Sequence, residues 1–413
     1  MTPSDARAVA EQRPVSLLGT VGPWYFIIAF VARVPYAMMV VGVLTLVSSG
    51  RGSISYGGLA SAAVGIGTAC FGALLGAAAD RFGQRLVLLL IAGANAALMV
   101  VFAAVVYSDL PIGVVLAVAF GIGSTAPQVA PMSRARLVGV IADRIAPDRR
   151  SRTVSSTMAY ESAADETVFV LGPFVVGILA SAIAPWAPLV GAAVLTVGFV
   201  GAFALHPSGR RVDAGRTHDG RPASPVRDLF RARILVIVVG MAGVGAFFGT
   251  SLTSLTSFMT DLGDGESAGV MYGIMGIGSA ILALAVSALP ARFTPRARWI
   301  AFGAVMVGGS VLVGLAHDLA SMAIALGLVG IGVGPTLVTQ YSFGAAHSPA
   351  GRSTTVMTML GSSLIVGQSL GAAVAGEVAE GAGTAVALWL PLVAAGVVCA
   401  AGLANAALNR PVR

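Results

Sequence analysis

The chain has 413 residues, of which 56% are hydrophobic and only 10% are charged, and its mean hydropathy is +0.88. Soluble domains carry roughly 25% charged residues, so this composition excludes a globular enzyme and indicates a membrane protein. All basic residues are arginine, which excludes a phosphate-binding loop of the G-x-x-x-x-G-K-[ST] type, because that loop requires a lysine.

Apolar runs of about 20 residues, the length that crosses a ~30 Å hydrocarbon core as a helix, recur along the whole chain. They predict an all-α membrane protein with twelve transmembrane helices, at residues 22–47, 56–79, 86–107, 112–138, 154–183, 186–206, 234–259, 267–290, 299–316, 320–343, 354–379 and 384–408. Nearly all arginines then fall on the side of the two termini, and the opposite side keeps only Arg51. Because basic loops stay in the cytoplasm, we expect a multi-pass protein of the cell (inner or plasma) membrane with both termini cytoplasmic. The formal charge of +7 then reflects topology and not a nucleic-acid partner.

The first predicted helix contains a basic residue, Arg33, about halfway along and close to Pro35 in "FVARVPYAMM". Both cysteines of the chain lie inside apolar runs, and the four histidines are scattered over separate predicted loops. These positions provide no spacing that suits a metal site or a disulfide. We therefore expect no metal and no cofactor.

The loop after the second helix contains the motif "GAAADRFGQR". It resembles the loop signature of the major facilitator superfamily, roughly G-x-L-x-D-R-x-G-x-R, at Gly76, Asp80, Arg81, Gly83 and Arg85. The resemblance implies two six-helix bundles related by a pseudo-two-fold axis along the membrane normal. It also implies that these five residues form a conformational latch that holds the inner mouth closed. The chemistry agrees, because Asp80 would lie at a helix end, within reach of arginines and of the positive end of another helix. The alternative is a solvated loop whose arginines only set the topology.

The fifth predicted helix carries three acids, Glu161, Asp165 and Glu166, in "AYESAADETVFVLGPFVVGILA". A carboxylate in hydrocarbon costs about 2.5–3.5 kcal/mol, so these side chains must be paired, protonated or in contact with water. Glu161 and Asp165 are one helical turn apart and share a face, whereas Glu166 points about 100° away from Asp165. The resemblance implies that the first, fourth and fifth helices flank a central cavity. We therefore expect Arg33 to meet Asp165 or Glu166, and Arg134 of the fourth helix to lie near Glu161.

Two interpretations of this charge network are open. In one, the ion pairs only hold the first bundle together. In the other, Asp165 or Glu166 is a proton-coupling acid whose proton affinity depends on the distance to Arg33. Later in the same helix, Gly172, Pro173 and Gly177 are similar to the G-P-x-x-G-G motif of proton-driven exporters in the superfamily, although the spacing differs.

The two halves of the sequence superpose at an offset of 211 residues. "GLASAAVGIGTA" (58–69) meets "GVMYGIMGIGSA" (269–280), and Gly123 meets Gly334. Such parallel repeats are known from transporters. We expect an N-terminal six-helix bundle at 1–206, a cytoplasmic linker at 207–232 and a C-terminal six-helix bundle at 233–413.

The second half offers hydroxyl, amide and aromatic side chains in its apolar runs instead of charges. At an offset of 202 residues, Ser363, Gly367 and Gln368 stand where the first half has its three acids. Other polar and aromatic side chains lie on the seventh and tenth helices. The expected substrate cavity is lined by Phe247, Thr250, Thr336, Thr339, Gln340 and Gln368.

The pattern predicts a secondary active transporter that works by alternating access and is not an enzyme. Its expected activity is proton-coupled efflux of small amphipathic or hydrophobic molecules by a monomer in the lipid bilayer. An uptake permease or a sugar or metabolite exporter on the same fold is the alternative. A scaffold or sensor is a further alternative that the sequence favours less, because no additional soluble domain is predicted.

Overall fold

The computed structural model describes residues 16–52, 54–211, 224–263, 268–290 and 292–408, and within these ranges all regular structure is helical. The N-terminal half contains α2 (Leu17–Val21), α3 (Pro23–Val31), α4 (Val34–Gly50), α5 (Ile54–Phe82), α6 (Gln84–Val106), α7 (Ile112–Ser124), α8 (Val129–Arg144), α9 (Pro147–Ala182), α10 (Ala187–Leu195), the π-helix η1 (Thr196–Val200), α11 (Gly201–Leu205) and the 3₁₀-helix η2 (Pro207–Arg211). The C-terminal half contains η3 (Val226–Phe230), α12 (Ala232–Asp261), α13 (Ala268–Ala285), η5 (Val286–Ala288), α14 (Pro295–Gly314), α15 (Leu319–His347), α16 (Ser353–Ala382), α17 (Thr384–Ala387) and α18 (Leu390–Leu408).

Eleven helical segments of the described chain are long and apolar enough to cross a membrane. The shorter apolar helix Met271–Ala285 lies where another span was predicted. The predicted all-α membrane architecture is therefore confirmed. The expected placement of the chain termini concerns residues 1–15 and 409–413, which lie outside the described ranges.

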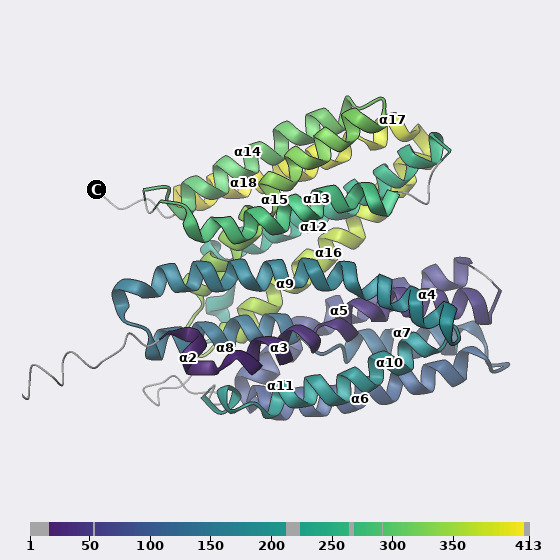
Figure 1. Ribbon diagram of the computed structural model, residues 1–413, viewed down its shortest axis with the longest axis horizontal. Coiled ribbons are helices and arrows are strands. Elements are labelled where there is room, and N and C mark those ends of the chain that lie inside the picture. The colour runs from purple at the N-terminus through teal and green to yellow at the C-terminus, as the bar shows by residue number, and fades with distance from the viewer. Residues whose placement is uncertain (1–15, 53, 212–223, 264–267, 291, 409–413) are drawn as a thin grey trace, which may run out of the picture.

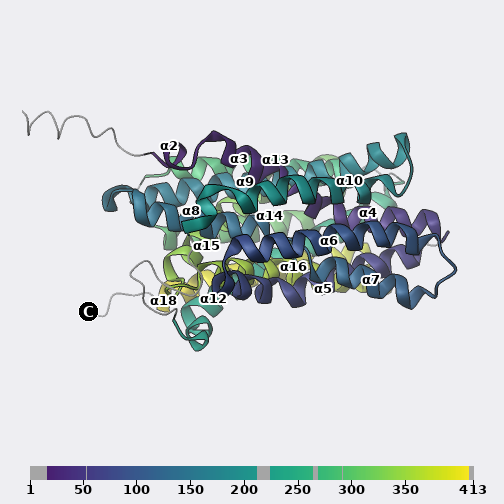
Figure 2. The same ribbon diagram turned by 90° about the horizontal axis from the view of Figure 1, so that it is seen from below.

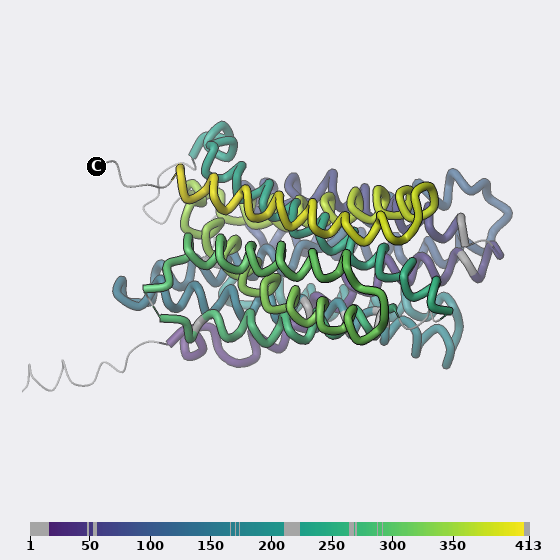
Figure 3. Tube along the Cα trace, turned by 90° about the horizontal axis from the view of Figure 1, so that it is seen from above, coloured from purple at the N-terminus to yellow at the C-terminus, as the bar shows by residue number. Residues whose placement is uncertain are grey.

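The two halves of the chain form two bundles that lie side by side along their length. Figure 1 shows the N-terminal bundle below and the C-terminal bundle above. Figure 2 looks onto α6 and α10 of the first bundle, and Figure 3 looks onto the second bundle with α18 in yellow. The described chain begins (α2) and finishes (α18) at the same end of the molecule. We call this the terminal end.

Two helices predicted as continuous are broken in the structure. The first span divides into α3 and α4 around Arg33, because Pro35 has no N–H to continue the ladder. The fourth span divides into α7 and α8 at residues 125–128, which include Pro127. Irregular backbone at membrane depth is tolerated where protein or a water-filled cavity surrounds it. The breaks therefore point to the place where a cavity lies.

The internal repeat corresponds to equivalent close helix contacts in the two bundles. A Cβ added to Gly123 of α7 would overlap the carbonyl oxygen of Val64 in α5. A Cβ added to Gly334 of α15 would overlap the carbonyl oxygen of Ser279 in α13. Small residues at helix interfaces in membranes allow such close backbone approach. The repeated glycines are thus explained by packing.

The bundles meet through a few helices. α9 of the first half packs against α13 and α15, and α16 of the second half packs against α5 and α8. α9 is longer than predicted, because it begins at Pro147, which is well suited to a first helical turn. The acids predicted to be buried therefore lie in the middle of a helix that faces the other bundle.

Candidate functional site

Four charged side chains form one network inside the first bundle. Arg33 places Nη2 2.5 Å from Oε2 of Glu161 and Nη1 3.2 Å from Oδ1 of Asp165. Arg134 places Nη2 2.7 Å from Oδ2 of Asp165. Asp165 therefore bridges two guanidinium groups, and the four charges sum to zero.

The local structure explains how these groups meet. Glu161 and Asp165 are one turn apart on α9, so both carboxylates project from the same face. Arg33 stands at the break between α3 and α4, and Arg134 lies in the second turn of α8, after the break that contains Pro127. Two helix breaks thus bring two arginines to one helix face.

Glu161 and Asp165 differ in their surroundings. The Glu161 side chain is fully buried, and its Oε1 accepts a hydrogen bond of 3.0 Å from the Ser133 hydroxyl. Ser133 in turn lies 2.9 Å from the hydroxyl of Tyr25. The Asp165 side chain keeps 21% of its surface exposed. Asp165 is accordingly the acid of the network that solvent reaches.

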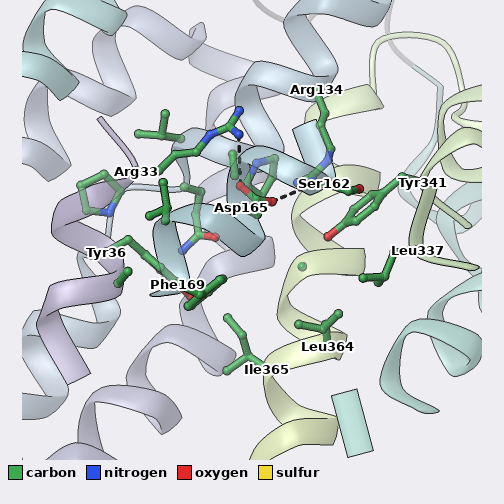
Figure 4. A pocket seen from close by; sticks show the side chains of 18 of the residues that line it. Arg33, Tyr36, Arg134, Ser162, Asp165, Phe169, Leu337, Tyr341, Leu364 and Ile365 are labelled. Carbon is green, nitrogen blue, oxygen red and sulfur yellow. Dashed lines mark hydrogen bonds and ion pairs between the residues drawn. The ribbon is translucent and has the colours of Figure 1, made fainter. Parts of the chain in front are cut away.

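A chamber lies next to this network, between the two bundles (Figure 4). Its empty volume is about 870 Å³, including the part open to solvent. Its polar wall comes mainly from the first half and contains Arg33, Tyr36, Gln128, Arg134, Ser162 and Asp165. Its remaining wall is mostly apolar and includes Phe169, Phe248, Leu337, Tyr341, Leu364 and Ile365. The chamber can hold a molecule that has one polar end and an apolar body.

Arg134 also touches the second bundle. Its guanidinium carbon lies 3.8 Å from the centre of the Tyr341 ring on α15. In Figure 4, Arg134 stands between Asp165 and Tyr341. A guanidinium over an aromatic face is attracted by the ring quadrupole, so this contact links the charge network of one bundle to a helix of the other.

A second contact between the bundles lies at the terminal end. Asp80 of α5 accepts hydrogen bonds from the backbone N–H groups of Thr354 and Thr355, at 3.2 and 2.7 Å, at the start of α16. Gln84 supports the same turn by donating to the Thr354 hydroxyl at 3.0 Å. Arg136 of α8, which is fully buried, donates to the Gln84 amide oxygen at 3.2 Å. These contacts join the two bundles at the terminal end.

The structure brings together only part of the predicted latch. Gly76 allows α5 to approach α16, because a Cβ added to Gly76 would overlap the Thr358 hydroxyl. Gly83 precedes α6 and has a φ of 90°, a backbone conformation that favours glycine. Arg81 and Arg85 are exposed, and Arg81 lies over the ring of Phe82. The acid and the glycines are thus placed at the contact, whereas the two arginines are on the surface.

The expected charge network is assembled with two differences in its pairings, one of which is that Arg33 also pairs with Glu161. Arg33 meets Asp165 as expected, but the ion pair of Arg134 is with Asp165 and not with Glu161. The side chain of Glu166 lies outside the described residues. The proton-coupling role of these groups stays a prediction.

The structure does not place the six side chains expected to line the cavity among the lining residues of this chamber. The hydroxyls of Thr250, Thr336 and Thr339 donate to carbonyl oxygens of their own helices, as hydroxyls in apolar helices often do. Phe247 and Gln340 are fully buried inside the second bundle. Gln368 packs against α12, because a Cβ added to Gly249 of α12 would overlap the backbone carbonyl oxygen of Gln368. The sequence analysis missed Tyr36 and Ser162, which line the chamber.

The sequence model of the Major Facilitator Superfamily matches residues 25–372. The chain belongs to this superfamily. It is a multi-pass membrane transporter and not an enzyme, in agreement with the resemblance found in the loop motif. Among the described residues, no group of three His, Cys, Asp or Glu side chains could hold a metal ion.

Solved structures share the major facilitator fold at low sequence identity. The human organic anion transporter MFSD10 (TETRAN) aligns with a TM-score of 0.68 and 18% identity, covering 95% of this chain and 100% of that one. A bacterial homologue of the iron transporter ferroportin in an outward-facing state aligns with a TM-score of 0.74 and 15% identity, covering 93% and 98%. The Escherichia coli fucose:proton symporter aligns with a TM-score of 0.65 and 14% identity, covering 92% and 99%. A search of curated proteins found no match.

Proposed function

We propose that this protein is a proton-coupled secondary transporter of small amphipathic molecules, with Asp165 as the group that carries the proton. The supporting observation is that Asp165 bridges Arg33 and Arg134 at 3.2 and 2.7 Å while 21% of its side-chain surface is exposed. A carboxylate in this position can take a proton from water in the chamber. Intramembrane acids of this kind are default candidates for proton relays.

The same geometry suggests how protonation acts on the bundles. A proton on Asp165 removes the negative partner of Arg134, and Arg134 also lies on the ring of Tyr341 in the other bundle. Protonation therefore changes a contact across the gap between the bundles. The contacts of Asp80 with the first turn of α16 would then have to break for the terminal end to open.

The direction of transport depends on how proton and substrate share the chamber. If they occupy it in turn, a proton gradient drives export, which is the efflux predicted from the sequence. If they occupy it together, the gradient drives uptake, which is the alternative. The similar structures are named for an organic anion, iron and a sugar with a proton, so the shared fold leaves the substrate class open.

We further propose that the chain works as a monomer in the cell membrane, with the terminal end in the cytoplasm. The distribution of arginines supports this orientation, because Arg81, Arg85 and Arg144 lie at helix ends on that side. The expected partners are therefore lipid, protons and one small molecule, without nucleic acid.

The test uses the full chain in liposomes with an imposed pH gradient and a panel of amphipathic probes. The expected result is a probe flux that follows the gradient and that loses this dependence in Asp165→Asn. Thr167→Val, an exposed position on the same helix, serves as the matched control and should behave as wild type. A flux that ignores the gradient in wild type and is unchanged in Asp165→Asn would refute proton coupling, and the network would then only hold the bundle together.

A further inference from the structure

We propose that the chamber binds small organic anions with an apolar body, carboxylates above all, each together with one proton on Asp165, and that it discriminates against organic cations. This inference rests on the proposed function, because it names the substrate class of the same site. It is supported by the charge balance of the network, by its unpaired donors and by the geometry of Asp165.

The charge balance of the network limits which ligands can bind without leaving a net charge in the site. Arg33 and Arg134 stay protonated, since a guanidinium does not lose its proton in proteins. The two acids, Glu161 and Asp165, balance them, so the network changes only from zero to positive when an acid takes a proton. An added cation would leave a net positive charge in a low-dielectric site, which is unfavourable. A monoanion bound with one proton restores a net charge of zero.

The polar wall of the chamber contains two guanidinium groups that are not fully paired. Within the described part of the chain, Nε of Arg33, Nε of Arg134 and Oγ of Ser162 are buried without a hydrogen-bond partner. These residues line the chamber, and Arg33 and Arg134 keep only 4% and 1% of their surface exposed. Arginine nitrogens can only donate. Because both arginines of this wall can only donate, a ligand that binds beside them brings acceptors, as a carboxylate does.

Asp165 itself shows how a carboxylate fits between the two guanidinium groups. Its two oxygens accept one from each arginine, at 3.2 Å from Arg33 and 2.7 Å from Arg134. Once protonated, Asp165 can no longer balance both cations, and the carboxylate of a ligand can take its place beside them. Charge-assisted bonds between arginine and carboxylate are among the strongest in proteins.

The groups that face Asp165 come from each of the charged or polar helices around it. α4 brings Tyr36, α8 brings Arg134, α15 brings Tyr341, and Arg33 stands at the α3–α4 break. On α9 itself, Glu161 and Tyr160 are the neighbouring titratable groups among the described side chains, and Glu166, whose side chain lies outside them, follows Asp165 in the sequence. α13, α10 and η5 also pack on α9, and Tyr272 of α13 is the titratable residue in their sequences. Asp165 is the partly exposed acid among these groups, so the bound proton is assigned to it.

The other side of the chamber suits the apolar body of such a ligand. Phe169, Leu337, Leu364 and Ile365 lie on the side of the chamber away from the arginines (Figure 4). Phe248 also lines the chamber. The ligand would thus place its anionic end at the arginines and its body between the bundles. Because anion and proton enter together, the coupling would be cotransport, which selects the uptake alternative.

The test compares three probes of equal chain length on the purified full chain: octanoate, octanamide and octylammonium. We expect octanoate to bind most tightly and octylammonium most weakly. Calorimetry in buffers of different ionisation enthalpy should show about one proton taken up for each octanoate bound. Over the pH range in which binding takes up one proton, the octanoate affinity should rise about tenfold for each unit that the pH falls, as linkage requires.

Two variants sharpen this test. Asp165→Asn leaves the two arginines with a permanent excess charge, so octanoate should bind without proton uptake and without pH dependence. Thr167→Val should match wild type in both measurements. Octylammonium or octanamide binding as tightly as octanoate, octanoate binding without a proton in wild type, or no binding of octanoate would each overturn the proposal.

A failure of the anion proposal can be distinguished from a failure of proton coupling. A pH gradient that drives octanamide or octylammonium flux, lost in Asp165→Asn, would keep proton coupling and reject the anion. A flux that ignores the gradient for every probe would reject proton coupling itself.

Discussion

Asp80 on α5 and Thr355 on α16 join the two bundles at the terminal end. Oδ2 of Asp80 accepts both the backbone N–H of Thr355, at 2.7 Å, and its hydroxyl, at 2.5 Å. The first N–H groups of a helix have no acceptor within that helix, and the helix dipole favours a negative charge there. Asp80 therefore caps α16 from the opposite bundle, and separation of the bundles at this end would break the cap.

The first prediction concerns this cap. Asp80→Asn keeps the size of the side chain but removes its charge, and hydrogen bonds to charged groups contribute about 1.5–3 kcal/mol each. The population with a closed terminal end should then fall on the order of tenfold relative to the open one. Spin labels at the exposed positions Ala142 and Ala297, one in each bundle, would report a longer distance by pulsed electron paramagnetic resonance.

The matched control for this prediction is Arg81→Gln. Arg81 belongs to the same motif but is exposed and lies over Phe82. We expect its label distances to equal those of wild type. A change in Arg81→Gln as large as that in Asp80→Asn would mean that the loop acts through its net charge and not through the cap.

The second prediction separates the two acids of the charge network. Glu161 is fully buried beside Arg33, and removal of one partner of a buried ion pair costs about 3–5 kcal/mol. Glu161→Gln should therefore lower the melting temperature clearly, whereas Asp165→Asn, at a partly exposed site, should lower it less. Thermal unfolding in detergent measures both. Equal decreases in melting temperature in the two variants would contradict the assignment of Glu161 as the structural acid and Asp165 as the acid that carries the proton.

The sequence predicted the elements that depend on local pattern and on composition. The positions of the apolar spans, the internal repeat and the Asp80 motif follow from hydropathy, period and residue type. The presence of buried acids on α9 and the need for arginine partners also follow, because an unpaired carboxylate in hydrocarbon is unfavourable.

The sequence could not specify which side chains share the chamber. The breaks at Arg33 and at Pro127 change the direction of two helices, and the pairing of Arg134 with Asp165 depends on that change. The sequence analysis expected the hydroxyls of Thr336 and Thr339 to line the cavity because they are polar. In the structure these hydroxyls donate to carbonyl oxygens of their own helix. The geometry between neighbouring helices of the first bundle decides the ion pair, and each threonine hydroxyl takes an acceptor on its own helix. No local sequence pattern encodes either outcome.

The third prediction concerns the contact of Arg134 with Tyr341. The guanidinium carbon of Arg134 lies 3.8 Å from the centre of the Tyr341 ring. Cation–π contacts contribute about 0.5–2 kcal/mol. Tyr341→Leu should therefore change the ratio of molecules with an open terminal end to those with a closed one, by about 2- to 30-fold for this range of energies. Tyr341→Phe keeps the ring and should change this ratio little. The same label pair measures both. If Tyr341→Phe behaves as Tyr341→Leu, the hydroxyl and not the ring face carries the contact.

The last prediction concerns the close approach of α5 and α16 at Gly76. A Cβ at this position would overlap the Thr358 hydroxyl and lie 2.9 Å from the Thr358 Cβ, so Gly76→Ala should separate the helices and open the terminal end, as Asp80→Asn does. Gly139→Ala on α8 is the control, because no atom lies within 4 Å of its added Cβ. Thr358→Ala in the same chain should restore part of the closure by removing the overlapping hydroxyl. A closed terminal end in Gly76→Ala alone would show that Thr358 can move aside, and that the cap by Asp80 suffices without the close glycine contact.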